Sequence, residues 1–78
     1  MNNNNMKTRV WNKPTVQKAL SSLRSCKNSK NQKLFEVVKK STGFYEVRSI
    51  NKKQLVFSAL IGSMGYLVRF DERLFIKQ

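Results

Sequence analysis

The pattern of hydrophobic and polar positions changes once along the chain, from a helical spacing to a strand spacing. In the first part, four apolar residues fall at positions i, i+3, i+4 and i+7, the spacing of one helix face: Val16, Ala19, Leu20 and Leu23. Pro14 suits the first turn of this helix, and Asn12 or Thr15 could cap it. The spacing therefore predicts an amphipathic helix over residues 14–26.

Beyond the polar segment 27–32, turn residues separate five short runs rich in strand-forming side chains. These runs are Leu34 to Lys39, Phe44 to Ile50, Leu55 to Ile61, Tyr66 to Phe70 and Arg73 to Ile76. The connections are too short for parallel crossovers, and Asp71-Glu72 is expected to close a tight hairpin, so neighbouring strands should pair antiparallel. The prediction is an α+β fold: one N-terminal amphipathic helix followed by a four- to five-stranded antiparallel β-meander, with the helix covering one face.

The predicted elements divide the chain into two parts. Residues 1–13 are expected to be a basic, partly disordered N-terminal arm, and residues 14–78 a single small α+β domain. Asn2 to Asn5 form a low-complexity polar run, so order is expected to begin near Trp11. On this division, deleting residues 1–13 should weaken anion binding far more than folding.

Charge is the compositional feature that bears most on function. The chain has 78 residues, with 16 Lys and Arg against 4 Asp and Glu, for a net charge of +12. The first acidic residue is Glu36, so the basic excess is concentrated in the N-terminal half. Such a charge is self-repelling in a compact domain, and an acidic partner would neutralise it. Nucleic acid is the commonest partner of this kind, because phosphate contacts release counterions.

Catalysis and metal binding find little support in the composition. There is no histidine, and Cys26 is the only cysteine, which excludes imidazole bases, an internal disulfide and a structural zinc set. Glu36 and Glu46 could approach each other across a hairpin, but each is outnumbered by nearby cations that would hold it ionised as a salt-bridge partner. We therefore expect a non-enzyme with no cofactor. Cys26 ends the apolar stripe and is interpreted as a small buried hydrophobe rather than a reactive thiol.

The candidate nucleic-acid-binding residues come from the arm, the helix, the polar segment and the strand turns. They are Lys7, Arg9, Trp11, Lys13, Lys18, Arg24, Lys27, Lys30, Lys33, Lys39, Lys40, Arg48, Lys52 and Lys53. Trp11 either stacks on a base or packs on the sheet, and packing is favoured because of its size. Six further aromatic residues could include a base-stacking platform on an open sheet, but core positions are favoured for them: Phe44, Tyr45, Phe57, Tyr66, Phe70 and Phe75. The pairs Lys39-Lys40 and Lys52-Lys53 fall at opposite ends of the meander, and only the segment 27–32 could bridge them.

The leading functional hypothesis is a non-enzymatic, basic nucleic-acid-binding module. RNA is slightly favoured over DNA, in a ribonucleoprotein-type role, because no groove-reading helix is evident. Contacts to about six phosphates would give a log–log salt slope near −5. The alternative is a small adaptor or inhibitor that docks on an acidic protein surface through a strand edge or the strand Tyr66 to Phe70. Binding to an anionic membrane surface through the predicted helix is a third and weaker hypothesis, since the apolar face of that helix is narrow.

The sequence also bears on location. No apolar run approaches the length of a membrane span, and the lone thiol suits a reducing compartment, so an intracellular, cytoplasmic protein is expected. The acid-free N-terminus equally has the composition of a targeting segment, and organellar import stays open as an alternative. The oligomeric state is not determined by the sequence pattern.

Overall fold

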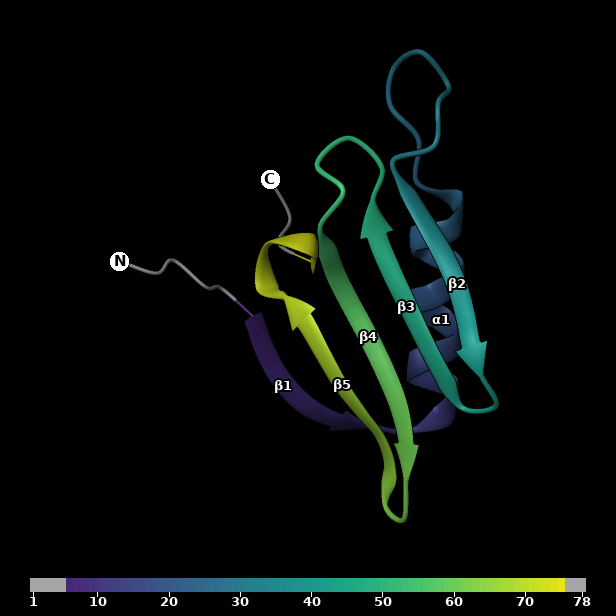
Figure 1. Cartoon of the computed structure of the whole chain (residues 1–78), viewed down its shortest axis with the longest axis vertical. Coiled ribbons are helices and arrows are strands. Elements are labelled where there is room, and N and C mark those ends of the chain that lie inside the picture. Colours follow the sequence, from purple (N-terminus) through teal and green to yellow (C-terminus); the bar gives the residue numbers. More distant parts are fainter. Residues whose placement is uncertain (1–5, 76–78) are drawn as a thin grey trace.

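A computed structural model describes residues 6–75 and shows one helix packed on one face of a five-stranded antiparallel sheet (Figure 1). The elements in chain order are β1 (Met6–Trp11), α1 (Lys13–Ser25), β2 (Phe35–Ser41), β3 (Phe44–Ser49), β4 (Leu55–Gly62), β5 (Gly65–Asp71) and the short 3-10 helix η1 (Glu72–Phe75). The strand order is β1-β5-β4-β3-β2. The predicted α+β class and antiparallel sheet are confirmed, although a strand precedes the helix.

Helix α1 forms where the apolar spacing predicts it, and the cap is Asn12. The Asn12 Oδ1 accepts hydrogen bonds from the backbone N–H of Thr15 at 3.0 Å and from the Thr15 hydroxyl at 2.6 Å. The cap thus supplies an acceptor for the Thr15 N–H, which has no partner within the first turn of the helix. Pro14 has no backbone N–H, so it leaves no unpaired donor at this position. All four residues of the predicted stripe are buried: Val16, Ala19, Leu20 and Leu23. No helix in the described residues is long and apolar enough to cross a membrane.

Strands β2 to β5 form the predicted meander, each pairing antiparallel with the next. Side chains alternate between the two faces, so cross-strand partners such as Val47 and Phe57, or Ala59 and Val68, meet on the face that α1 covers. The strand residues in the buried core are Val47, Val56, Phe57, Ala59, Tyr66 and Val68. The stripe of α1 packs on these residues, which makes this the hydrophobic core of the domain.

Strand β1 corrects the expectation that order begins near Trp11. Met6 to Trp11 pair antiparallel with Asp71 to Tyr66, so residues assigned to a basic arm form an edge strand. Pairing supplies partners for the backbone of β5, which would otherwise be an exposed edge. Deleting residues 1–13 would remove this strand, so the structure indicates damage to the fold as well as to the charge. Asn2 to Asn5 lie outside the described residues.

The prediction of a last strand over Arg73 to Ile76 is also wrong, as far as the structure describes these residues. Asp71 Oδ1 accepts a hydrogen bond from the Arg73 backbone N–H at 3.0 Å, and the chain turns into η1 instead of a hairpin. A strand following β5 would pair on the edge that β1 already occupies. The side chain of Phe75 and residue Ile76 lie outside the described part.

Candidate nucleic-acid interface

The polar segment between α1 and β2 is an ordered loop built around Asn28. The Asn28 Oδ1 accepts hydrogen bonds from the backbone N–H of Lys30 at 2.8 Å and of Gln32 at 3.0 Å, and its Nδ2 donates to Gln32 Oε1 at 3.1 Å. Lys27 and Lys33 form an antiparallel bridge at the base of the loop. The lysines of this segment are therefore held by a fixed backbone while their side chains stay exposed.

The turn between β3 and β4 presents a second pair of lysines in a similar way. Ser49 holds both of them: its carbonyl oxygen accepts from the Lys53 N–H at 2.7 Å, and its hydroxyl accepts from the Lys52 N–H at 3.3 Å. The Ser49 N–H donates to the carbonyl of Gln54 at 2.8 Å and closes the turn. The backbone of Lys53 has φ 55°, a left-handed conformation that residues other than glycine adopt only at a cost in free energy.

A backbone hydrogen bond joins the two loops at their bases. The Ile50 N–H donates to the Leu34 carbonyl oxygen at 3.0 Å, and Figure 1 shows both loops projecting from the same end of the sheet. Arg24, in the last turn of α1, lines one shallow pocket together with Lys33 and Ile50. We call the cations of this region the basic end: Arg24, Lys27, Lys30, Lys33, Lys52 and Lys53.

The acidic residues of the chain leave the basic end largely unneutralised. Within the described residues, the ion pairs are Lys7–Glu72 at 3.6 Å, Arg48–Glu46 at 3.7 Å and Arg73–Asp71 at 2.8 Å. None of the six basic-end cations takes part in them. Glu36 lies close by, in the pocket that Arg24 and Lys33 line, and is exposed. The excess positive charge at this end is thus available to an external anion.

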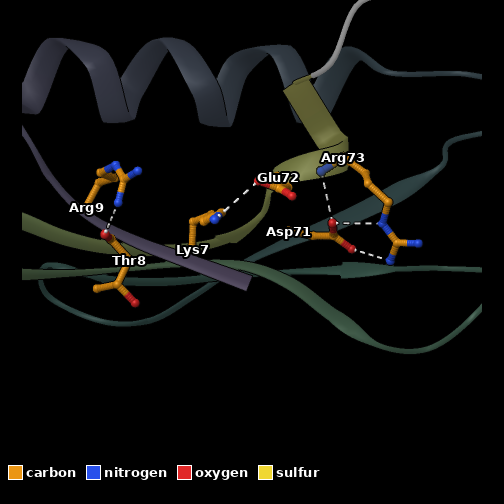
Figure 2. A network of polar contacts seen from close by, with 6 residues as sticks. All are labelled: Lys7, Thr8, Arg9, Asp71, Glu72 and Arg73. Atoms are coloured by element: carbon orange, nitrogen blue, oxygen red, sulfur yellow. Dashed lines mark hydrogen bonds and ion pairs between the residues drawn. The ribbon is translucent and has the colours of Figure 1, made fainter. Parts of the chain in front are cut away.

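Arg73 belongs to the same end of the molecule but is already engaged. Its Nε and one terminal nitrogen donate to the two Asp71 carboxylate oxygens at 3.0 and 2.8 Å, as Figure 2 shows. These hydrogen bonds are the main reason that the pKa of Asp71 lies below its ordinary value. Arg73 was not among the candidate residues predicted from the sequence.

The other candidate residues do not join the basic end. Lys13, at the start of α1, lines a pocket with Lys39 at the opposite end of the sheet, near the turn that follows Lys40. This confirms that the two lysine pairs lie at opposite ends. The segment 27–32 joins the Lys52-Lys53 turn and does not bridge the two ends. Lys18 lies midway along α1.

The remaining cations lie on the faces of the sheet. Figure 2 shows Lys7 and Arg9 on the α1 side of β1, with Thr8 on the other side. Arg9 donates to the Thr8 carbonyl oxygen at 3.0 Å, and Lys7 faces Glu72. Arg48 lies on the face away from α1, by its alternation with Val47. Lys7 and Arg9 are neighbours on one face and Arg48 lies on the other, so the three residues do not form one patch.

Trp11 packs on the sheet, as the sequence analysis favoured. Its ring centroid lies 5.2 Å from that of Phe70 and 6.0 Å from that of Phe57. Tyr66 is buried as well, whereas Phe44 is half-buried on the uncovered face. The strand Tyr66 to Phe70, considered above as a docking strand, lies within β5 and is paired on both sides, so it offers no free backbone edge.

Groups that could hold a metal do not converge in the described part of the chain, where no three His, Cys, Asp or Glu side chains cluster. Cys26 is half-buried at the C-cap of α1, and its backbone N–H donates to the Leu23 carbonyl oxygen. It is less buried than expected for a core residue.

Comparison with known proteins adds no relative: the chain matches no protein-family model, no curated protein sequence and no solved structure.

Proposed function

We propose that this protein is a non-enzymatic nucleic-acid-binding module that holds a phosphate backbone at its basic end. The observation that carries the proposal is the convergence of six cations on two adjoining ordered loops and the last turn of α1, outside every ion pair found among the described residues. Pre-ordered lysines lose less conformational freedom on binding than lysines on a mobile tail. Phosphate contacts of this kind supply affinity without reading sequence.

RNA is the favoured ligand within this proposal. Helix α1 packs along the sheet through its apolar face and carries few cations on its exposed side, so it is poorly suited to reading a groove of duplex DNA. An intracellular, cytoplasmic location is part of the proposal, because a nucleic-acid ligand and an unpaired Cys26 thiol both fit a reducing compartment.

The salt dependence of binding tests the proposal. Affinity for a fluorescently labelled single-stranded RNA should fall with a log–log slope of about −4 if six phosphates are contacted, and of about −5 for a duplex DNA. Affinity that does not change between about 0.05 and 0.3 M salt would refute phosphate binding.

The state of the purified protein separates this proposal from the adaptor hypothesis. Nucleic acid that co-purifies would raise the 260/280 absorbance ratio, and a high-salt wash should lower that ratio again. A protein that is free of nucleic acid before the wash, and that is recovered with one acidic protein, would instead favour the adaptor.

A further inference from the structure

The face of the sheet opposite α1 carries a continuous apolar row. Val10 pairs with Leu67, Leu67 with Leu60, and Leu60 with Phe44, so these four side chains lie side by side across β1, β5, β4 and β3. Val10, Leu67 and Leu60 are 58%, 51% and 50% exposed. No other described element covers this face, and Figure 1 shows it open toward the viewer, with α1 behind. Exposed apolar rows of this kind mark contact surfaces.

The charges on this face balance, in contrast to the rest of the chain. The next row contains Arg69 on β5, Ser58 on β4 and Glu46 on β3, which are cross-strand partners. Arg48 and Glu36 pair at the following position. Two carboxylates thus accompany two guanidinium groups on a chain whose net charge is +12. This balance makes the face unsuited to a polyanion and suited to a protein surface.

We propose that this open face binds a second copy of the same chain. The two copies would pack face to face about a two-fold axis parallel to β4, with the apolar rows in contact. Because β4 is the central strand, the axis brings Leu60 against Leu60 of the second copy and Leu67 against its Phe44. A self-complementary arrangement is what a two-fold interface requires.

The charged row is complementary about the same axis. Arg69 and Glu46 lie on the two strands that flank β4, at one level, so the rotation places Arg69 of each copy opposite Glu46 of the other. Within one chain, the contact of Glu46 with Arg48 is long, at 3.7 Å, and the Glu46 side chain is only 18% exposed. An axis running across the strands along this charged row would instead bring Arg69 onto Arg69 and Glu46 onto Glu46, which like-charge repulsion disfavours.

The orientation of the dimer affects the ligand surface. A two-fold axis parallel to β4 leaves both basic ends at the same end of the assembly, and it doubles the positive charge presented there. The dimer does not rest on the proposed nucleic-acid function, because its surface is the uncovered face and not the basic end.

Salt distinguishes dimerisation from nucleic-acid binding. Sedimentation equilibrium of the full chain, freed of nucleic acid, should show a concentration-dependent dimer that tightens between about 0.05 and 0.5 M salt as repulsion between the copies is screened. Polyanion binding weakens over the same range. A protein that is monomeric at about 1 mM in about 0.5 M salt, or a dimer that salt dissociates, would overturn the proposal.

Paired substitutions on adjacent residues test the surface. Leu60→Lys places a charge on the axis and should raise the dimer dissociation constant about tenfold or more. Ile61→Lys is the matched control, because Ile61 is equally exposed, at 52%, but alternates onto the α1 side. Equal effects of the two variants would overturn the assignment of the face.

A charge exchange tests the axis. Arg69→Glu should weaken the dimer, because two carboxylates would then face each other, and Arg69→Glu combined with Glu46→Arg should restore it at least partly. A single variant as tight as the unsubstituted chain, or a folded double variant no tighter than Arg69→Glu alone, would overturn the proposed axis. If the double variant does not fold, Arg69→Glu alone still tests the axis, and the Leu60 and Ile61 pair still tests the face.

Discussion

The backbone N–H of Ile50 donates to the carbonyl oxygen of Leu34 at 3.0 Å and joins two loops that lie 16 positions apart in the chain. Through this bond, the lysines of the segment before β2 and those of the β3–β4 turn belong to one end of the molecule. The candidate interface therefore depends on strand register, because both residues adjoin the paired strands β2 and β3.

Charge removal at the two ends of the sheet should have unequal effects. Replacing Lys27, Lys30 and Lys33 together by Gln should reduce affinity for single-stranded RNA about tenfold or more and make the salt slope shallower by about 2, since three phosphate contacts are lost. Fluorescence anisotropy across a salt series measures both quantities.

The matched control removes the same charge from the opposite end: Lys13, Lys39 and Lys40 are replaced by Gln. This variant should keep nearly the full salt slope. If both triple variants lose affinity equally, binding depends on net charge alone, and the basic end is not the interface.

Asn28 should matter for binding although it carries no charge. Asn28→Ala removes the side chain that orders the loop, and the free energy of unfolding should fall by about 1 kcal/mol. Affinity for RNA should fall severalfold while the salt slope is unchanged, because the number of cations is the same. Ser29→Ala is the neighbouring control and should leave both unchanged; a shallower slope for Asn28→Ala would contradict the ordering role.

Lys53 offers a way to weaken binding without loss of stability. Lys53→Gly removes one cation but relieves a residue at φ 55°, whereas Lys52→Gly removes a cation from the same turn without that relief. The Lys53 variant should be more stable than the Lys52 variant by about 1 kcal/mol in urea unfolding. Equal stabilities would indicate that the left-handed conformation costs nothing here.

A side chain at Gly65, in the β4–β5 turn, should lower the stability of the fold. Its φ is +130°, and a Cβ would lie 2.7 Å from the Trp11 carbonyl oxygen on β1. Gly65→Ala should therefore lower the free energy of unfolding by more than about 1 kcal/mol, or the melting temperature by at least about 4 °C. Gly62→Ala is the control, since its Cβ would meet Gly65 O only at 3.6 Å; equal melting temperatures of the two variants would contradict the strain.

Asp71 should contribute to the acid sensitivity of the fold. Its pKa is lowered in the folded chain, chiefly by hydrogen bonds from Arg73, so folding favours the ionised carboxylate. The stabilisation is present above the ordinary pKa of the carboxyl and is lost as the pH falls through the lower folded value. Asp71→Asn should lessen the decline in urea stability between about pH 5 and 2.

The control for this pH dependence is Glu72→Gln. The ion pair of Glu72 with Lys7 is long, at 3.6 Å, and both side chains are nearly half exposed, so little stability should depend on it. An acid limb that is unchanged in Asp71→Asn would show that the Asp71–Arg73 pair does not stabilise the fold.

Local patterns in the sequence predicted much of the fold. The spacing of Val16 to Leu23 defines α1 because a helix places such residues on one face, whatever surrounds them. The alternation around Val47 and the short turns likewise define β3 and its antiparallel neighbours. These features depend on residues close in the chain, which is why they can be recognised without coordinates.

Strand β1 was missed although Met6, Thr8 and Val10 alternate with Lys7 and Arg9, because the two cations were interpreted as part of a basic arm. On the α1 side of the sheet it carries Lys7 and Arg9 beside Trp11, so one apolar residue accompanies two cations. Its strand conformation depends on hydrogen bonds with β5, about 60 residues later in the chain. Pairing between β1 and β5 also explains why the predicted strand at Arg73 does not form, since β1 occupies the edge of β5 on which that strand would have paired.

The sequence by itself determined the helix, the meander and the excess of positive charge, since spacing, turn residues and composition are properties of the chain alone. Tertiary structure decided where that charge gathers: the register of β2 and β3 brings Leu34 beside Ile50, and two lysine loops come together at one end. It also decided that Trp11 packs inward and that Leu60 and Leu67 form part of an exposed row. Pairing between distant strands sets these positions, and a pattern of neighbouring residues does not contain that pairing.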